Sequence, residues 1–70
     1  MSDDIVSLGE AYPKEQARCR AVLGSYREIG PAGALGAMLI EDMLQRADRA
    51  VVEGDVVEML RLYKQMRGTE

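Results

Sequence analysis

Few side chains in this sequence are suited to chemistry. The chain has no histidine, and Cys19 is its single cysteine. A cysteine nucleophile usually needs a neighbouring histidine as base, and a typical zinc site needs several Cys or His ligands. A lone cysteine also forms no disulfide within its chain. We therefore predict no catalytic thiol, no metal site and no internal disulfide, and we expect Cys19 to act as a small buried apolar residue.

The acidic residues do not suggest a catalytic pair either. Glu41 and Asp48 can share one side of a helix, but carboxylates on an exposed helix with no base or ligand around them are ordinary surface charges. No glycine-rich loop follows a strand, so no phosphate-binding loop is indicated. We expect no enzyme activity, no catalytic residue, no cofactor and no small-molecule substrate.

The arginines raise the alternative of a small nucleic-acid-binding transcriptional regulator. Arg18, Arg20 and Arg27 have the right chemistry for phosphate contacts, and the break at residues 54–55 resembles a helix-turn-helix corner. However, the following helix opens with Asp55 and Glu58, where base-contacting residues usually lie. From residue 11 onward nine acids balance nine bases, so there is no basic surface for nucleic acid. Nucleic-acid binding remains the alternative, not the main prediction.

The positions of proline and glycine in the sequence predict an all-α fold with three helices, over residues 13–29, 31–53 and 56–67. Pro13 suits the first position of a helix, and Gly30 followed by Pro31 combines a helix stop with a restart. Gly54 marks a second break, after which Asp55 is a good N-cap residue. No segment alternates apolar and polar residues as a half-buried β-strand does. Seventy residues arranged in this way predict a small three-helix bundle or an open helical array.

The N-terminal residues differ in composition from the rest of the chain. Residues 1–11 are acidic, and after Met1 their large apolar side chains are Ile5, Val6 and Leu8. We predict a flexible acidic arm over residues 1–11 and a single helical domain over residues 12–70, because chain ends are commonly mobile. The alternative is that Ile5, Val6 and Leu8 pack on the bundle. Neither a signal peptide nor a membrane-spanning run is indicated, so a cytoplasmic protein without membrane contact is expected.

Helical periodicity assigns an inner face to each predicted helix. These faces contain, in order along the chain, Cys19, Val22, Leu23, Tyr26 and Ile29; then Gly36, Leu39, Ile40, Met43, Leu44, Ala47, Ala50 and Val51; then Val56, Met59, Leu60, Leu62, Tyr63 and Met66. The back of the first helix, at Ala17, Ala21, Gly24 and Ser25, carries small residues that we expect to face solvent.

The residues after the proline corner are apolar on every side of the helix. Nine residues from Ala32 to Ile40 have no polar side chain, and Leu35 and Met38 fall outside the inner stripe, beside Asp42. Small glycines can let another helix approach closely. We therefore predict a partner-binding surface for a homodimer; its residues are Gly33, Leu35, Gly36, Met38 and Asp42. The alternative is that another helix of the same chain packs on these glycines.

The segment from Tyr26 to Ile40, followed by residues 47–48 and 54–57, resembles short uncharacterised helical proteins encoded by phages and prophages. The resemblance extends over about residues 12–67 and brings no catalytic or binding residues with it. It implies a bacterial cytoplasm and a function in binding a host or phage protein. Together with the apolar surface, it predicts a non-enzymatic protein that acts through protein–protein interaction.

Overall fold

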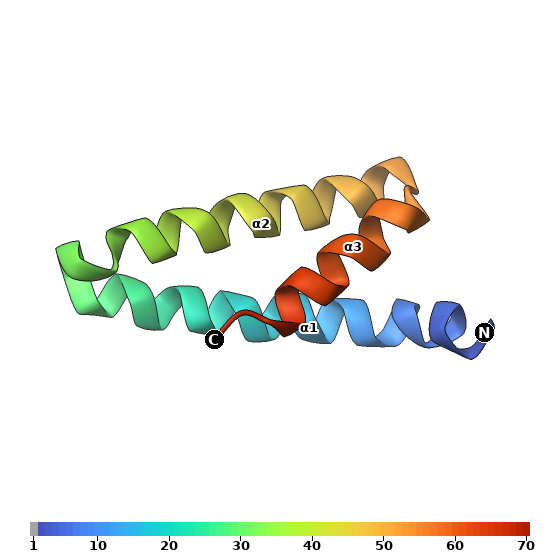
Figure 1. The fold of residues 1–70 in the computed structure, drawn as a ribbon, viewed down its shortest axis with the longest axis horizontal. Helices are drawn as coiled ribbons and strands as arrows, with labels where there is room; N and C mark the ends of the chain where they lie inside the picture. The colour runs from blue at the N-terminus through green and yellow to red at the C-terminus, as the bar shows by residue number, and fades with distance from the viewer. Residues whose placement is uncertain (1) are drawn as a thin grey trace.

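Residues 2–70 form three α-helices and one short 3-10 helix. The computed structural model describes the backbone of residues 2–70 and the side chains of residues 8–70. Helix α1 comprises Ser2–Ile29, η1 Gly30–Gly33, α2 Ala34–Glu53 and α3 Val56–Arg67. α1 and α2 run antiparallel, and α3 folds back across them in a body of 42 × 19 × 14 Å (Figure 1). The predicted all-α class is therefore confirmed, as are the breaks at residues 30 and 54–55.

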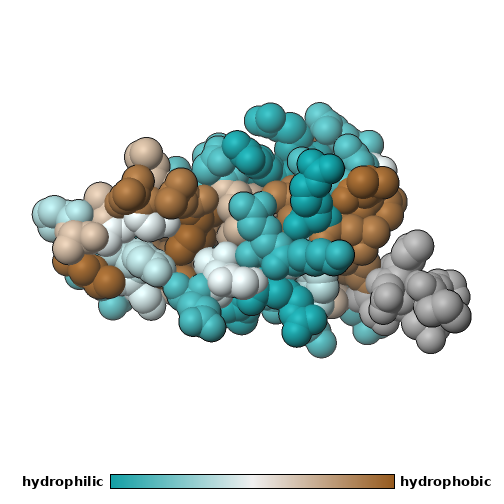
Figure 2. All heavy atoms as spheres, in the orientation of Figure 1, coloured by the Kyte–Doolittle hydropathy of each residue, from teal (hydrophilic) through white to brown (hydrophobic). Residues whose placement is uncertain are grey.

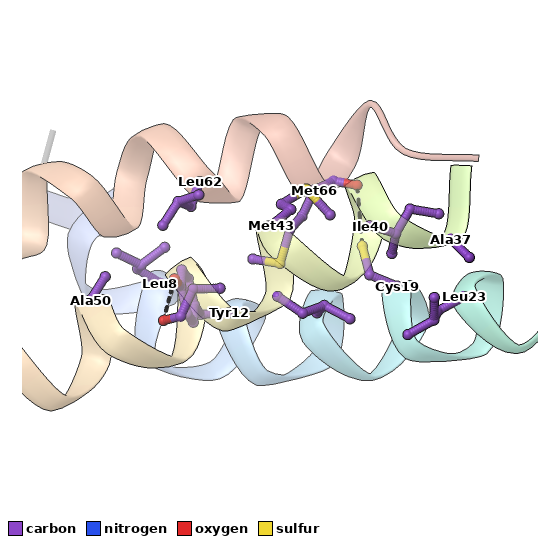
Figure 3. Close-up of a cluster of buried hydrophobic side chains, with 12 residues drawn as sticks. Leu8, Tyr12, Cys19, Leu23, Ala37, Ile40, Met43, Ala50, Leu62 and Met66 are labelled. Carbon is purple, nitrogen blue, oxygen red and sulfur yellow. Dashed lines mark hydrogen bonds between the residues drawn. The ribbon is translucent and has the colours of Figure 1, made fainter. Parts of the chain in front are cut away.

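The core lies between the three helices. Figure 3 shows Leu8, Tyr12, Cys19 and Leu23 of α1 facing side chains of α2 and α3. Met66, Cys19 and Ala47 are fully enclosed. Within residues 8–70, the buried apolar residues are Leu8, Tyr12, Cys19, Leu23, Ala37, Ile40, Met43, Leu44, Ala47, Ala50, Leu62 and Met66.

The first corner depends on Gly30, whose φ of +85° is a conformation that other residues rarely adopt. Pro31 follows inside η1, so the chain makes a 3-10 turn before it enters the α-helix. The second helix consequently begins at Ala34 and not at Pro31, which corrects the predicted start by three residues. A 3-10 turn at a helix N-terminus is common, and nothing in the sequence separates it from a first α-turn.

The second connection uses both signals that the sequence offers. Gly54 has a φ of +66° and ends α2, and the carboxylate of Asp55 accepts a hydrogen bond from the Glu58 backbone N–H at 3.1 Å. The Asp55 N–H donates to the Ala50 carbonyl at 3.0 Å, while the Glu58 carboxylate pairs with Arg61 at 3.4 Å. Only half of a capping box is thus formed, and α3 begins at Val56 as predicted.

The predicted start of the first helix at Pro13 is wrong, because α1 begins at Ser2 and passes through Pro13. Leu8 is only 5% exposed and belongs to the core. Part of the predicted arm over residues 1–11 therefore packs on the bundle, as the alternative proposed for Leu8. The side chains of Ile5 and Val6 lie outside the described residues.

Several residues predicted on the inner faces are exposed. Ile29 and Leu39 retain 61% and 63% of their surface, and Val51 and Val56 retain nearly half. Val51 and Val56 flank the turn between α2 and α3, whereas Ile29 and Leu39 lie toward the corner end. For Ile29 and Leu39 the reason is length: α3 has 12 residues against 20 for α2. It crosses from the α2–α3 turn toward the middle of α1 and ends before it reaches the corner (Figure 1). Among the described residues, none therefore adds a third layer over the corner end of the α1–α2 pair.

Candidate interaction surface

Tyr26 covers the two glycines that were predicted to bind a partner. A Cβ added at Gly33 would overlap the Tyr26 carbonyl oxygen, and one added at Gly36 would lie 2.7 Å from the Tyr26 ring. The Tyr26 hydroxyl also donates to the Glu70 carbonyl at 2.8 Å. Gly33 and Gly36 thus allow α1 of the same chain to approach closely, which is the alternative stated above. We correct their assignment to a partner surface for this reason.

Leu35 and Met38 face away from the body, as the sequence predicted. Each is 67% exposed, and Leu39 beside them is 63% exposed. We call these three residues the corner patch. Residues three and four positions apart on a helix are neighbours, so the three side chains form one continuous apolar surface. In Figure 2, hydrophobic residues gather at this end of the molecule, and a second group lies at the opposite end, by the α2–α3 turn.

A hollow of about 400 Å³ adjoins the corner patch. Its walls are Arg27, Gly30, Pro31, Ala34, Ala37, Met38 and Glu41. The Arg27 guanidinium donates to the Glu41 carboxylate across its rim. The hollow is open to solvent and mostly apolar, so it can accept an apolar side chain but holds no converging set of reactive groups.

Asp42, the last of the predicted partner residues, is exposed and forms an ion pair with Arg46 at 3.1 Å, one turn further along α2. Such a pair contributes a few tenths of a kcal/mol, about 0.3–0.5. Asp42 lies one turn below Met38 on the outer side of α2, so it adjoins the corner patch without being part of its apolar surface.

Two further ion pairs connect α1 and α2. Arg27 pairs with Glu41, and Arg20 lies 3.5 Å from Asp48. Arg20 and Arg27 lie two helical turns apart on α1, and Glu41 and Asp48 lie two turns apart on α2. The two ion pairs are therefore neighbours along one flank of α2. Glu41 and Asp48 are therefore neutralised by arginines of α1 and do not form a carboxylate pair.

Arg18 satisfies the C-terminal end of α3, a role that the sequence did not reveal. Its guanidinium donates to the carbonyl oxygens of Met66 and Thr69, the latter at 2.9 Å, and pairs with Glu15 at 2.9 Å. The last carbonyls of a helix have no partner within it. The Met66 carbonyl also accepts from the Thr69 backbone N–H at 3.0 Å, and Arg18 adds a donor from α1, which connects the end of α3 to the bundle.

Cys19 is fully buried, as predicted, and its thiol lies 3.6 Å from the Met66 carbonyl. Burial raises the pKa of the Cys19 thiol above its ordinary value. The thiolate is the reactive form of cysteine, so both burial and protonation keep this side chain unreactive at neutral pH.

Tyr12 and Gln16 are the polar members of the core that sequence reasoning missed. The Tyr12 hydroxyl donates to the Ala47 carbonyl at 2.9 Å, and Gln16 Nε2 donates to Asp48 at 2.8 Å. Burial, followed by the charges of Asp48 and Glu58, raises the pKa of Tyr12, which keeps the phenol protonated as a donor. Tyr12 and Gln16 continue the three- and four-residue spacing of Cys19 and Leu23 toward the N-terminus. A helix that starts before Pro13 would have placed both on the inner face.

No reactive constellation is found among the described residues. No group of three or more His, Cys, Asp or Glu side chains lies close enough to hold a metal ion there. A second hollow, of about 370 Å³ by the α2–α3 turn, is lined by Arg46, Arg49, Ala50, Glu53, Asp55 and Glu58. Within residues 8–70, every buried side-chain nitrogen or oxygen has a hydrogen-bond partner. None of the helices described is long and apolar enough to cross a bilayer.

Comparison with models of protein families, with curated proteins and with solved structures gives no match to this chain. The resemblance to short phage and prophage proteins therefore stays a prediction.

Proposed function

We propose that this chain is a non-enzymatic protein that acts through protein–protein contact, and that it associates with itself as a homodimer through the corner patch. The observation that carries the proposal is the exposure of Leu35, Met38 and Leu39, each between 63% and 67%, as one continuous surface. Single exposed apolar residues are ordinary, whereas a contiguous group of large ones is typical of an interaction site.

The expected strength of this contact is modest. Full burial of one such side chain contributes roughly 1.5–3 kcal/mol, so two thirds of that from three residues in each of two copies gives roughly 6–12 kcal/mol. Association itself costs an estimated ~4–15 kcal/mol. The corner patch alone therefore supports a weak dimer that forms with rising concentration, and additional contacts are needed for a tight one.

A second partner, a host or phage protein in a bacterial cytoplasm, is part of the proposal. Its support is the resemblance over residues 26–40, 47–48 and 54–57, together with the open apolar hollow that adjoins Met38. This partner would place an apolar side chain into the hollow beside Pro31 and Ala34. No small-molecule substrate is needed for such a function.

The alternative, a nucleic-acid-binding regulator, has less support. Arg18, Arg20 and Arg27 are the residues that raised it, and each is engaged with an acceptor of its own chain. The alternative predicts retention on heparin or DNA that weakens steeply as salt increases, because phosphate contacts release counterions. The proposed protein-binding function predicts no such retention.

Leu35→Glu tests the proposal. A carboxylate in the centre of the corner patch must lose its hydration in the dimer, so we expect this variant to stay monomeric at concentrations where the parent chain associates. Light scattering coupled to size-exclusion chromatography measures the mass. Circular dichroism should remain that of the parent, since Leu35 is exposed.

Ala21→Glu is the matched control. Ala21 is an exposed helical position on the back of α1, and it receives the same charge. This control should associate as the parent does. Equal association of Leu35→Glu and the parent would rule out the corner patch as the contact.

A further inference from the structure

The outer side of α2 carries a regular stripe of exposed residues. We call it the outer stripe; its residues are Leu35, Met38, Asp42, Gln45, Arg49 and Val52, all of them exposed. Their spacing alternates between three and four residues, which is the spacing of the a and d positions in a coiled coil. At about 100° per residue the outer stripe points away from the buried face of α2. That buried face consists of Ala37, Ile40, Met43, Leu44, Ala47 and Ala50.

Within the described residues, no element covers this stripe. α1 and α3 both lie on the other side of α2, which forms one long edge of the molecule (Figure 1). Leu35 and Met38 are each 67% exposed at one end of the stripe, and Val52 is 86% exposed at the other. A stripe that begins and ends with apolar residues and has polar residues in the middle is suited to a partner that is similarly arranged.

We propose that the outer stripe binds a second copy of this chain, with the two α2 helices antiparallel and the twofold axis between Met43 and Leu44. This inference rests on the proposed self-association and specifies its geometry. In this register Leu35 meets Val52 of the second copy. Met38 meets the aliphatic stem of Arg49, since long basic side chains cover apolar surface with their stems. Asp42 meets Gln45.

The charges select the antiparallel direction. Parallel helices in register would place Asp42 against Asp42 and Arg49 against Arg49, and like charges facing each other oppose association. In the antiparallel register, Asp42 lies near Arg46 and Arg49 of the second copy, so opposite charges meet at both sides of the axis. The same stripe is thus self-complementary in one direction only, as a twofold interface requires.

The flanks of the stripe are compatible with this arrangement. On one flank Glu41 would approach Asp48 of the second copy. Each of these carboxylates is already paired with an arginine of its own chain, Glu41 with Arg27 and Asp48 with Arg20. On the other flank Leu39 would lie against the stem of Arg46 of the second copy. Leu39 is 63% exposed in the single chain and would be covered in the pair.

The area that a dimer needs also favours contact along the whole helix. A stable interface usually involves roughly 20–30 residues from each partner, whereas the corner patch contains only Leu35, Met38 and Leu39. Contact from Leu35 to Val52 extends over about 26 Å of helix, at 1.5 Å per residue. It therefore adds the exposed residues of the second half of α2 to those of the corner patch.

Cysteine cross-linking distinguishes this register from other dimers. A disulfide requires Cα atoms within about 7 Å. Leu35 and Val52 of one chain are about 26 Å apart along the helix, so they cannot be joined within a molecule. We expect a mixture of Leu35→Cys and Val52→Cys chains to form a disulfide-linked heterodimer under mild oxidation. Neither variant alone should cross-link, because like positions lie far apart in the antiparallel pair.

A second mixture, Met38→Cys with Arg49→Cys, tests the same register at the next layer and should also cross-link. The parent chain measures background from Cys19, which is fully buried, and Ala17→Cys on the exposed back of α1 measures random collision. Intact mass under non-reducing conditions identifies each product, and the solution mass of every variant is measured in parallel.

The outcomes separate the two proposals. Cross-links in the mixtures alone support the antiparallel pair. Cross-linking of Leu35→Cys alone would show contact between corners, and dimers without cross-links in either mixture would exclude this register; both results overturn the inference and leave self-association intact. A parent chain that is monomeric throughout would overturn the proposed homodimer together with the inference.

Discussion

At the scale of single residues, Tyr26 explains why two glycines are found after the corner. Its carbonyl lies against Gly33 and its ring against Gly36, so both glycines provide space for α1. Gly24 provides a contrast, because a Cβ there would meet no atom within 4 Å. A methyl group added at Gly33 or Gly36 would therefore clash with Tyr26, whereas one added at Gly24 would not meet a neighbour.

We expect Gly33→Ala to lower the free energy of unfolding by roughly 1–3 kcal/mol, because the added Cβ overlaps backbone that cannot easily move. We expect Gly24→Ala, its matched control, to raise it by up to about 1 kcal/mol through better helix propensity. Urea titration followed by circular dichroism measures both. A Gly33→Ala chain as stable as the parent would contradict the close contact with Tyr26.

Sequence reasoning at this scale succeeded where one residue type has one usual environment. The burial of Cys19 and the exposure of Leu35 and Met38 were predicted and are confirmed. The partner of a glycine was not predictable, because a missing side chain does not indicate which surface fills its place. The role of Arg18 was equally hidden, since a capping guanidinium and a solvated one look alike in a sequence.

At the scale of elements, the first helix is longer than its proline suggests. Pro13 has no N–H, so the Gly9 carbonyl lacks its usual partner within α1. The burial of Leu8 and Tyr12, which both precede Pro13, offsets the lost hydrogen bond. Tertiary packing thus overrides a local signal that is used at many helix starts.

Leu8→Ala tests whether this extension contributes to stability. Removal of a buried leucine side chain typically costs about 2–5 kcal/mol, and we expect a loss in this range, with a lower thermal midpoint. Val57→Ala is the control, because Val57 is 70% exposed and its truncation should change stability by no more than about 0.5 kcal/mol. If Leu8→Ala left the midpoint unchanged, Leu8 would belong to a mobile arm.

The element boundaries that the sequence predicted well are those set by backbone chemistry. Gly30 and Gly54 adopt positive φ and Asp55 caps α3, so each break has a local cause. The starts of the first two helices were missed because proline occurs not only in the first turn of an α-helix. Pro13 lies inside α1, where packing compensates, and Pro31 lies in the 3-10 turn before α2. The sequence near Pro13 and Pro31 does not distinguish these cases.

At the scale of the whole molecule, the arrangement of three unequal helices determines which apolar residues are exposed. α3 is too short to cover the corner end of the α1–α2 pair (Figure 1). Ile29 and Leu39 therefore stay exposed although periodicity placed them on inner faces. Periodicity identifies the side of a helix that is apolar, but how far a neighbouring helix extends along that side depends on tertiary structure.

The exposed residues on the outer side of α2 form a surface that two copies of the chain can share. Apolar residues lie at its two ends, and acidic and basic residues lie between them. This order links the corner patch to Val52, which is 86% exposed near the other end of α2. We therefore expect the chain to associate with itself through this face.

The most direct test is the mass of the unmodified protein in solution, measured by sedimentation equilibrium over a wide range of concentrations. Self-association through the outer side of α2 predicts a mass that rises from one chain to two as concentration increases and then stays at two, because a twofold interface is closed. A mass of 7.7 kDa, that of a single chain, at the highest concentration would contradict it.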